Sequence, residues 1–564
     1  MNIKLSNLCM LFELHNIGGY IIPHSDEYQN EYTPDCSKRL EYMTGFTGSN
    51  GIAIITKDKQ YFWTDGRYKL QAQREIPEFV MCDRDFGVVN DDLVAINIGY
   101  NPMLFTSAQI EAFSKSLTLI PITQDLVDSI WKDKPVLPST NAYLYPIQYS
   151  GMDATSKLQI VRQNFATKAK YALITELESI CWLLNIRGVD TESVPVILGY
   201  LILSADEVIV FTDLSKISAS IISELKFVQF KPCNEIFTTL KSLNETLLID
   251  PTSCSVGLQS LIANKIEGIN PCALPKACKN NIEIECATQG HIKDAVALCE
   301  GLSWVQNNRG ITEHEVSLKL TELRSSQEGY VADSFPTIAG FRENGAIIHY
   351  RAPKNGSKTI SGDGMLLIDS GAHYWGCTTD VTRVLVFGTP TDEQKRRYTE
   401  VLKGHIALAS VKFPVGTFGC NIDILARQYL WDETLDYAHS TGHGVGNMLS
   451  VHEAPGYIGQ AKTQVQLQEG MIISNEPGFY KEGEFGIRIE NLMYVKKSSK
   501  EGFLEFAMLT LVPYARDLID ITMLSEKEIK YLKGYYQKIK AHVLPSLKGD
   551  AKIWCEYEME LGPK

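Results

Sequence analysis

Two aspartates stand at the facing ends of two strand-like runs in residues 365–387. Asp369 closes the run MLLI, and Asp380 precedes the run VTRVLVF. A strand, a turn and a second strand would bring both carboxylates to one place. Either aspartate alone is more typical of a turn residue that caps a strand end. The case for a chemical site therefore depends on other polar residues.

Histidines gather in the second half of the chain, where eight of the 11 lie between His291 and His452. His439, His443 and His452 fall within one glycine-rich stretch. Glycines allow close backbone approach and leave the rings free to turn inward. A neutral imidazole such as that of His443 is a common metal ligand. One histidine alone is more often a surface or core residue, but three so close together favour a site.

Two glutamates follow in strand-like surroundings. Glu476 ends the run that begins GMII and precedes the turn signal Pro477-Gly478. Further on, FGIRIENLMYV (485–495) alternates like one strand, and a period of two places Arg488 and Glu490 on the same face. Such a charged pair usually marks a solvated edge. Here the flanking residues are apolar, so both faces can be buried, and a buried glutamate needs a partner or a metal.

These segments offer four carboxylates and one imidazole: Asp369, Asp380, His443, Glu476 and Glu490. A ligand set rich in oxygen and without thiolate suits Mn²⁺ and similar divalent cations better than a structural zinc site. Four crowded carboxylates repel one another unless cations are bound. Two divalent cations would balance the four negative charges, and shared carboxylates would hold them about 3.5–4 Å apart, as in two-metal hydrolases.

The surrounding sequence predicts an α/β fold, whose strands and helices position these residues. Residues 51–56 and 61–64 are β-rich around the polar turn KDKQ and predict a hairpin, followed by a helix over 68–76. Apolar residues at helical spacing predict a long amphipathic helix over 282–306. A closing helix is expected over 525–543.

The length of 564 residues corresponds to about three or four domains. A proline-containing stretch at 132–146 is typical of a linker. The block that follows repeats the mix of strands and helices of the first, which suggests a duplicated domain. We therefore expect domains at 1–143, 144–277 and 278–564, the last with a C-terminal extension.

Bulk composition narrows the classes of protein. A net charge of −13 argues against a nucleic-acid partner. The 13 cysteines form no CxxC pair and no disulfide framework, which favours reduced thiols and a cytoplasmic location. The N-terminal residues make a poor signal peptide. The longest apolar stretch, 194–205, is too short to span a membrane and is expected to form buried strands.

Motifs along essentially the whole chain resemble the pita-bread metallopeptidases, and within them the long, three-domain cytosolic aminopeptidases P. TGFTGSNG and WTDGRY resemble the first domain and WLLNIRG the second. GAIIHY, LLIDSGA, TTDVTR, HSTGHGVG, NEPGFY and FGIRIEN resemble the catalytic domain. The resemblance implies two creatinase-like N-terminal α/β domains followed by a pita-bread catalytic domain. Each motif is weak alone, but their combination is highly specific.

The resemblance also implies residue roles. Asp369 would chelate one metal, Asp380 and Glu490 would bridge both, and His443 with Glu476 would complete the shell of the other. His349, His439 and His452 match histidines around the substrate that do not bind metal, and Arg488 and Tyr480 match a pair near the metal centre. The metals would be two divalent ions, Mn²⁺ by family expectation, with Zn²⁺ or Co²⁺ as alternatives.

The function implied is release of the N-terminal residue from peptides with proline at position two, through attack of a metal-bridging hydroxide. Prolidase, which cleaves Xaa-Pro dipeptides, is the nearest alternative, and the additional second domain argues against it. Methionine aminopeptidases normally lack two such N-terminal domains, creatinase lacks the metal ligands, and a non-catalytic binding protein of this fold would have lost them. The expected partners are peptides and a second copy of the chain, with no nucleic acid and no membrane.

Overall fold

The computed structural model describes residues 3–82 and 91–562. Two compact units divide the chain, an N-terminal unit of Met1–Pro146 and Met152–Pro275 and a C-terminal unit of Ile147–Gly151 and Lys276–Lys564. Within the described ranges, no helix combines the length and the apolar character that crossing a lipid bilayer requires.

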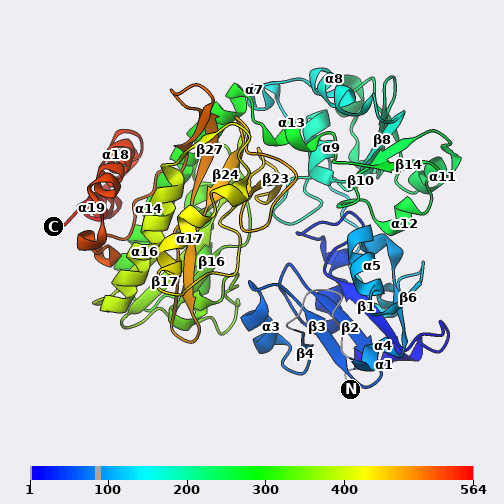
Figure 1. The fold of residues 1–564 in the computed structure, drawn as a ribbon, viewed down its shortest axis with the longest axis horizontal. Helices are drawn as coiled ribbons and strands as arrows, with labels where there is room; N and C mark the ends of the chain where they lie inside the picture. The colour runs from blue at the N-terminus through cyan, green and yellow to red at the C-terminus, as the bar shows by residue number, and fades with distance from the viewer. Residues whose placement is uncertain (1–2, 83–90, 563–564) are drawn as a thin grey trace. The chain divides into compact units, whose positions relative to one another are not determined.

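A mixed six-stranded sheet forms the first half of the N-terminal unit, with the order β4-β3-β2-β1-β5-β6 (Figure 1). Antiparallel pairing joins β1, β2 and β3, and parallel pairing joins the outer strands. The strands are β1 (Gly19–Pro23), β2 (Ile52–Thr56), β3 (Gln60–Trp63), β4 (Val80–Met81), β5 (Asn97–Tyr100) and β6 (Thr118–Pro121). The expected hairpin and the helix after it, α3 (Lys69–Glu75), are both present.

The second half of this unit contains a sheet of the same topology, ordered β12-β11-β10-β8-β13-β14. Its inner strands are again antiparallel and its outer strands again parallel. The strands are β8 (Tyr171–Ile174), β10 (Gly199–Ser204), β11 (Val208–Thr212), β12 (Gln229–Pro232), β13 (Leu247–Ile249) and β14 (Lys265–Glu267). Equal order and equal pairing in two consecutive sheets agree with a duplicated domain.

The apolar stretch at 194–205 departs from the prediction, because only its second half forms a strand, β10. Residues 194–198 are buried, but they belong to no strand. Pro195 has no backbone N–H to contribute to a ladder. The Leu198 N–H bonds the carboxylate of Asp190 at 2.8 Å instead of a neighbouring strand.

Long helices cover the sheets of the C-terminal unit (Figure 1). The longest, α14 (Asn281–Asn307), matches the amphipathic pattern and begins at a capping box of Asn280 and Glu283. The others are α15 (Glu313–Ser325), α16 (Asp392–Ala409), α17 (Ile424–Trp431), α18 (Glu526–His542) and α19 (Gly549–Glu558). The expected closing helix is α18, which Ser525 caps.

Three sheets of this unit carry or adjoin the candidate site. One has the order β16-β17-β20, another β15-β18-β19, and the largest β21-β28-β27-β24-β22-β23, while β25 and β26 pair as a hairpin. The strands used below are β16 (Ile338–Phe341), β17 (Gly364–Ser370), β20 (Val381–Phe387), β22 (Gly442–Gly444), β23 (Glu453–Ile458), β24 (Ile472–Asn475), β25 (Gly478–Lys481), β26 (Phe485–Arg488) and β27 (Asn491–Lys497).

The prediction of one continuous strand over residues 485–495 was wrong. The chain forms β26, leaves the ladder at Ile489 and Glu490, and continues as β27 in a different sheet. The reason is a change of partner, because β26 pairs with β25 whereas β27 pairs with β24. Glu490 thus lies at a junction between two sheets and not on the face of one strand.

Candidate metal centre

Different strands of the C-terminal unit bring the five expected ligands together. Asp369 lies near the end of β17, and Asp380 directly precedes β20, which pairs with β17. His443 is the central residue of β22. Glu476 directly follows β24, and Glu490 lies between β26 and β27. All five positions are therefore at strand ends or on a short strand, where several sheets meet.

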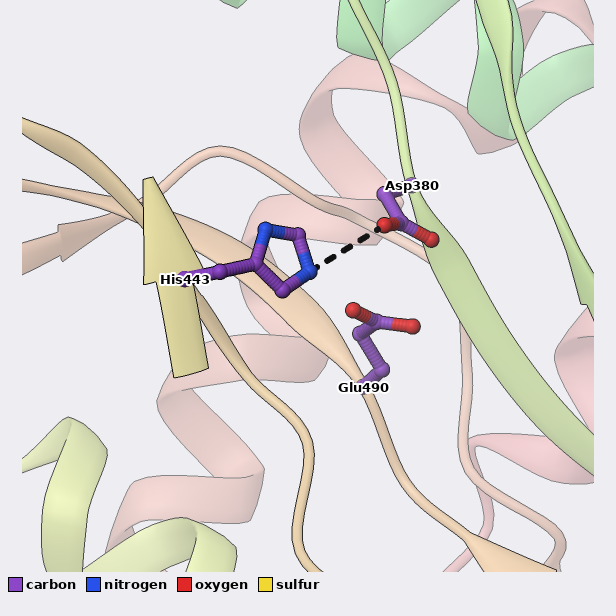
Figure 2. A group of neighbouring side chains, drawn as sticks. All are labelled: Asp380, His443 and Glu490. Carbon is purple, nitrogen blue, oxygen red and sulfur yellow. Dashed lines mark ion pairs between the residues drawn. The ribbon is translucent and has the colours of Figure 1, made fainter. Parts of the chain in front are cut away.

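Three of these side chains converge on one point (Figure 2). Asp380, His443 and Glu490 each offer one ligand atom, and these atoms lie within 4.8 Å of one another. His443 Nε2 is 3.6 Å from Asp380 Oδ2 and 3.3 Å from Glu476 Oε1. Glu476 thereby joins the same group.

Three buried carboxylate oxygens lack a hydrogen-bond partner among the described residues. They are Asp369 Oδ1, Asp380 Oδ1 and Glu490 Oε1. A buried polar atom without a partner is costly. Two of these oxygens belong to Asp380 and Glu490, which converge with the His443 imidazole, and such a set is of the type that divalent cations take. The residues present therefore fit the expected metal site.

The crowding of these carboxylates appears in their pKa values. Burial, then the charges of Glu490 and Asp369, raise the pKa of Asp380 well above its usual value. Burial and the charges of Glu476 and Asp369 raise the pKa of Glu490 to about 8. Burial opposes ionisation of Glu476 as well, but the hydrogen bond and the charge of His443 lower its pKa below the usual range. The group requires positive charge in order to remain ionised.

The orientation of His443 suits a ligand. Its Nδ1 lies 3.0 Å from the Gly444 carbonyl oxygen, so Nδ1 carries a proton and donates a hydrogen bond to that oxygen. This leaves Nε2 as the ring atom that a metal would take. Burial opposes a charge on this ring, but the hydrogen bond and charge of Glu476 and the charge of Glu490 raise the pKa of His443 to about 9. Without a cation, Nε2 therefore also carries a proton and faces Asp380 and Glu476. A divalent cation would take the place of that proton. The His443 backbone N–H donates to Ser474 Oγ at 2.9 Å, and the Ser474 hydroxyl donates to Glu476 Oε1 at 3.1 Å.

Arg488 connects the candidate ligand Asp369 to two further expected residues. Its Nη2 donates to Asp369 Oδ2 at 2.6 Å, and its Nη1 donates to the Tyr480 hydroxyl oxygen at 2.8 Å. The Tyr480 hydroxyl is 2.9 Å from His439 Nε2, and His439 Nδ1 donates to the Ser440 carbonyl at 2.8 Å. Tyr480 therefore donates to His439, whose ring is neutral because burial lowers its pKa to about 4.

Thr382 is a member of the site that the sequence analysis missed. Its hydroxyl donates to Glu490 Oε2 at 2.8 Å and accepts from Arg488 Nε at 3.1 Å, and the residue is fully buried. Thr382 also lies opposite Asp369 in the register of β17 and β20. A signal was available, because period-two alternation places residue 382 on the same strand face as Asp380.

Two more histidines were expected around the substrate. The His452 ring packs edge-on against that of His443, with centroids 4.4 Å apart. The next residue, Glu453, forms buried ion pairs with Lys276 and Lys279 at the start of β23. His349 is half-buried, and the carbonyl of its neighbour Ile348 accepts from Arg488 Nη2 at 3.3 Å.

His405 on α16 is a further residue that the sequence analysis did not single out. Its Nδ1 lies 3.0 Å from the Asn475 carbonyl, and its Nε2 lies 3.2 Å from Asn491 Nδ2. Asn475 and Asn491 are the direct chain neighbours of Glu476 and Glu490. Burial lowers the pKa of His405 to about 3, so the ring is neutral and acts through hydrogen bonds alone.

Known families match the chain in consecutive segments. Residues 4–130 and 133–283 each match a creatinase/prolidase N-terminal domain, residues 285–497 match metallopeptidase family M24, and residues 502–560 match the C-terminal region of that peptidase family. These matches agree with the expected fold class of two creatinase-like domains before a pita-bread domain. The exact boundaries expected at 143 and 277 stay predictions.

Individual proteins match over nearly the whole length. A probable Xaa-Pro aminopeptidase P of Laccaria bicolor is 37% identical over 98% of this chain and 92% of its own. The crystal structure of an X-prolyl aminopeptidase from Caenorhabditis elegans, described as a cytosolic enzyme with a di-nuclear active site, is 31% identical, with a TM-score of 0.93 over 99% of each chain. An Xaa-Pro dipeptidase from Bacillus anthracis shares the fold over only 64% of this chain, with a TM-score of 0.53 and 24% identity.

Proposed function

Because this chain belongs to metallopeptidase family M24 and aligns with Xaa-Pro aminopeptidases from end to end, we propose that it is a two-metal aminopeptidase that removes the residue before proline. One observation carries the metal-dependent part. Among the described residues, Asp369, Asp380 and Glu490 each have a buried carboxylate oxygen without a hydrogen-bond partner, and Asp380 and Glu490 converge with His443 on one point. The matches over 98–99% of this chain are to proteins named as Xaa-Pro aminopeptidases, which favours an aminopeptidase over a prolidase.

The residues that would hold the two cations are Asp369, Asp380, His443, Glu476 and Glu490. Two divalent cations supply Lewis acidity and an activated water when they are bound. The oxygen-rich set favours Mn²⁺, with Zn²⁺ or Co²⁺ as the alternatives. Arg488 fixes Asp369 and, through Thr382, Glu490, so the carboxylates are oriented before a cation binds.

Residues around the carboxylates position the peptide and move its protons. The free α-amino group of the substrate binds at Asp369, which limits cleavage to the first residue. Glu476 carries a proton from the attacking water to the leaving nitrogen. His452, which packs against His443, stabilises negative charge on the carbonyl oxygen. His439 and His349 position the substrate.

The hydrogen-bond chain from Arg488 to His439 has one direction. Arg488 donates to Tyr480, Tyr480 donates to His439, and His439 donates to a backbone carbonyl. Each of the three side chains thus donates a hydrogen bond to the next group in the chain, which holds it in one orientation. Their role is to keep the candidate ligand Asp369 and the substrate-facing His439 at a fixed separation.

Selection for proline follows from what the bond to be cleaved lacks. The nitrogen of an Xaa-Pro bond is part of the proline ring, so it carries no hydrogen, and the ring fixes φ. An enzyme that hydrogen-bonds this N–H in other peptides loses that contact with proline. A site that forms no such contact and that fits the ring prefers Xaa-Pro bonds.

Peptide hydrolysis tests the proposal directly. The protein is incubated with Arg-Pro-Pro, Arg-Ala-Ala and the dipeptide Arg-Pro, with and without Mn²⁺. We expect release of arginine from Arg-Pro-Pro only, and only with the metal. Cleavage of Arg-Pro but not of Arg-Pro-Pro would indicate a prolidase, and no cleavage of any peptide would indicate a binding protein. We also propose that the protein is cytoplasmic and forms a homodimer. Light scattering, which measures the mass of the particle in solution, tests the homodimer.

A further inference from the structure

One buried carboxylate accepts hydrogen bonds from residues on both sides of His349, the histidine that is expected to contact the substrate. Glu313, the first residue of α15, is fully buried. Its Oε1 accepts from the Phe341 N–H at 2.7 Å and from Asn344 Nδ2 at 3.0 Å. Its Oε2 accepts from the Tyr350 hydroxyl at 2.8 Å and from the Lys358 N–H at 3.3 Å. All four donors lie in residues 341–358, on both sides of His349.

The same segment also touches the candidate site. A 3₁₀ helix within it, η4 (Arg342–Ala346), packs against β26, the strand that carries Arg488. The approach is so close that a Cβ on Gly486 would lie 1.8 Å from the Gly345 carbonyl oxygen. Arg488 itself donates to the Ile348 carbonyl. The segment is therefore held at one side by Arg488 and at the other by Glu313.

Capping alone does not explain the place of Glu313. Thr312 and Glu315 already form the capping box of α15, and Glu315 is exposed. Glu313 points inward instead, where burial raises the pKa of its carboxyl group while its four donors favour the charged form. A buried carboxylate is costly unless its lone pairs are satisfied. These bonds all go to residues 341–358, so one carboxylate ties four points of this segment to the start of α15.

We propose that Glu313 is a positioning residue that sets the place of His349, whose chain neighbour Ile348 is bonded by Arg488 at the candidate site. This inference rests on the proposed function, because His349 acts only if a peptide binds there. Glu313 touches neither the substrate nor the candidate ligands. It acts by holding both ends and the middle of the segment that presents the histidine.

The test compares four variants: Glu313→Gln, His349→Ala, their combination, and the matched control Glu315→Gln from the same helical turn. In Glu313→Gln an amide NH2 group replaces one carboxylate oxygen. This group cannot accept hydrogen bonds from the donors in residues 341–358, so the segment should loosen. We expect a rise of about tenfold in KM for Arg-Pro-Pro, the size of one lost hydrogen bond to a charged group, with a smaller change in kcat. Metal content and the Glu315→Gln kinetics should not change.

A double-mutant cycle separates positioning from a general structural role. If Glu313 acts through His349, the combined variant has the KM of His349→Ala alone. Hydrogen exchange should show faster deuterium uptake in residues 341–358 for Glu313→Gln and not for Glu315→Gln. Tyr350→Phe removes one donor and keeps the carboxylate, so it should show the same change to a smaller extent even if Glu313→Gln folds poorly.

The inference is overturned if the KM increases of Glu313→Gln and His349→Ala multiply in the combined variant. It is also overturned if deuterium uptake in residues 341–358 is unchanged in Glu313→Gln. The proposed function stays intact in both cases. If the wild-type protein cleaves no Xaa-Pro peptide with Mn²⁺, the proposed function and this inference fail together. The two failures are distinguishable, because the first requires an active wild-type enzyme.

Discussion

Removing the hydroxyl of Thr382 should weaken metal binding without removing any ligand. Thr382→Val keeps the shape of the side chain, but it leaves Glu490 Oε2 without its donor at 2.8 Å and Arg488 Nε without its acceptor at 3.1 Å. The residue is fully buried, so water cannot replace the hydroxyl. Glu490 is then free to turn away from the position in which it faces Asp380.

The expected loss follows from the two bonds. Residues that orient metal ligands typically contribute 10- to 100-fold in metal affinity, or about 1.4–2.7 kcal/mol. A hydrogen bond to a charged group contributes about 1.5–3 kcal/mol, which falls in the same range. Because no ligand is lost, we expect kcat at saturating Mn²⁺ to fall less than the affinity for Mn²⁺.

Calorimetric titration of the metal-free protein with Mn²⁺ measures this affinity. Thr175→Val is the matched control, because Thr175 is also buried and donates to Ser253 Oγ at 2.9 Å, but it lies in the N-terminal unit. Thermal melting of both variants checks that each is folded. Equal Mn²⁺ affinity in Thr382→Val and in the wild type would refute the reasoning that this hydroxyl orients Glu490.

Three further outcomes are expected. Glu490→Ala should lose both its bound metal, as measured by metal analysis, and its activity in the peptide assay. The control Glu484→Ala changes an exposed glutamate and should keep both. Full activity of Glu490→Ala would contradict the metal site. A chelator should abolish activity and lower Tm, and Mn²⁺ should restore both, since a ligand at 100 times its Kd stabilises a fold by about 2.7 kcal/mol; an unchanged Tm would contradict a structured site. Burial and the charge of Glu27 raise the pKa of the fully buried Asp26 from 3.8 to about 6. The folded N-terminal unit then binds a proton that the unfolded chain has released, so its free energy of unfolding should fall by at most about 3 kcal/mol as the pH rises from about 4 to 6. Urea titrations of Asp26→Asn should lack this slope.

Elements with local causes were predictable from the sequence. The hairpin of β2 and β3, the helix α14 and the helix α18 follow from alternation, helical spacing and capping residues that lie next to them in the chain. The two N-terminal sheets were expected only as similar blocks. Their equal strand order depends on pairing between distant strands, so it became visible only in the structure.

The break between β26 and β27 shows where pattern analysis failed. Alternation in residues 485–495 is the same whether the chain forms one strand or two. The change of partner at Glu490 depends on β24 and β25, which are other parts of the chain. A local pattern holds no information about that change.

The sequence by itself determined the chemistry of the candidate site. Residue type decides charge and ligand preference, and the kinds of side chain at Asp369, Asp380, His443, Glu476 and Glu490 were sufficient to predict divalent cations. Only the tertiary structure decided how these groups are held. The bond from Thr382 to Glu490 and those from Glu313 to residues 341–358 join positions far apart in the chain. Such contacts arise from the packing of whole elements, and neither spacing nor residue type specifies them.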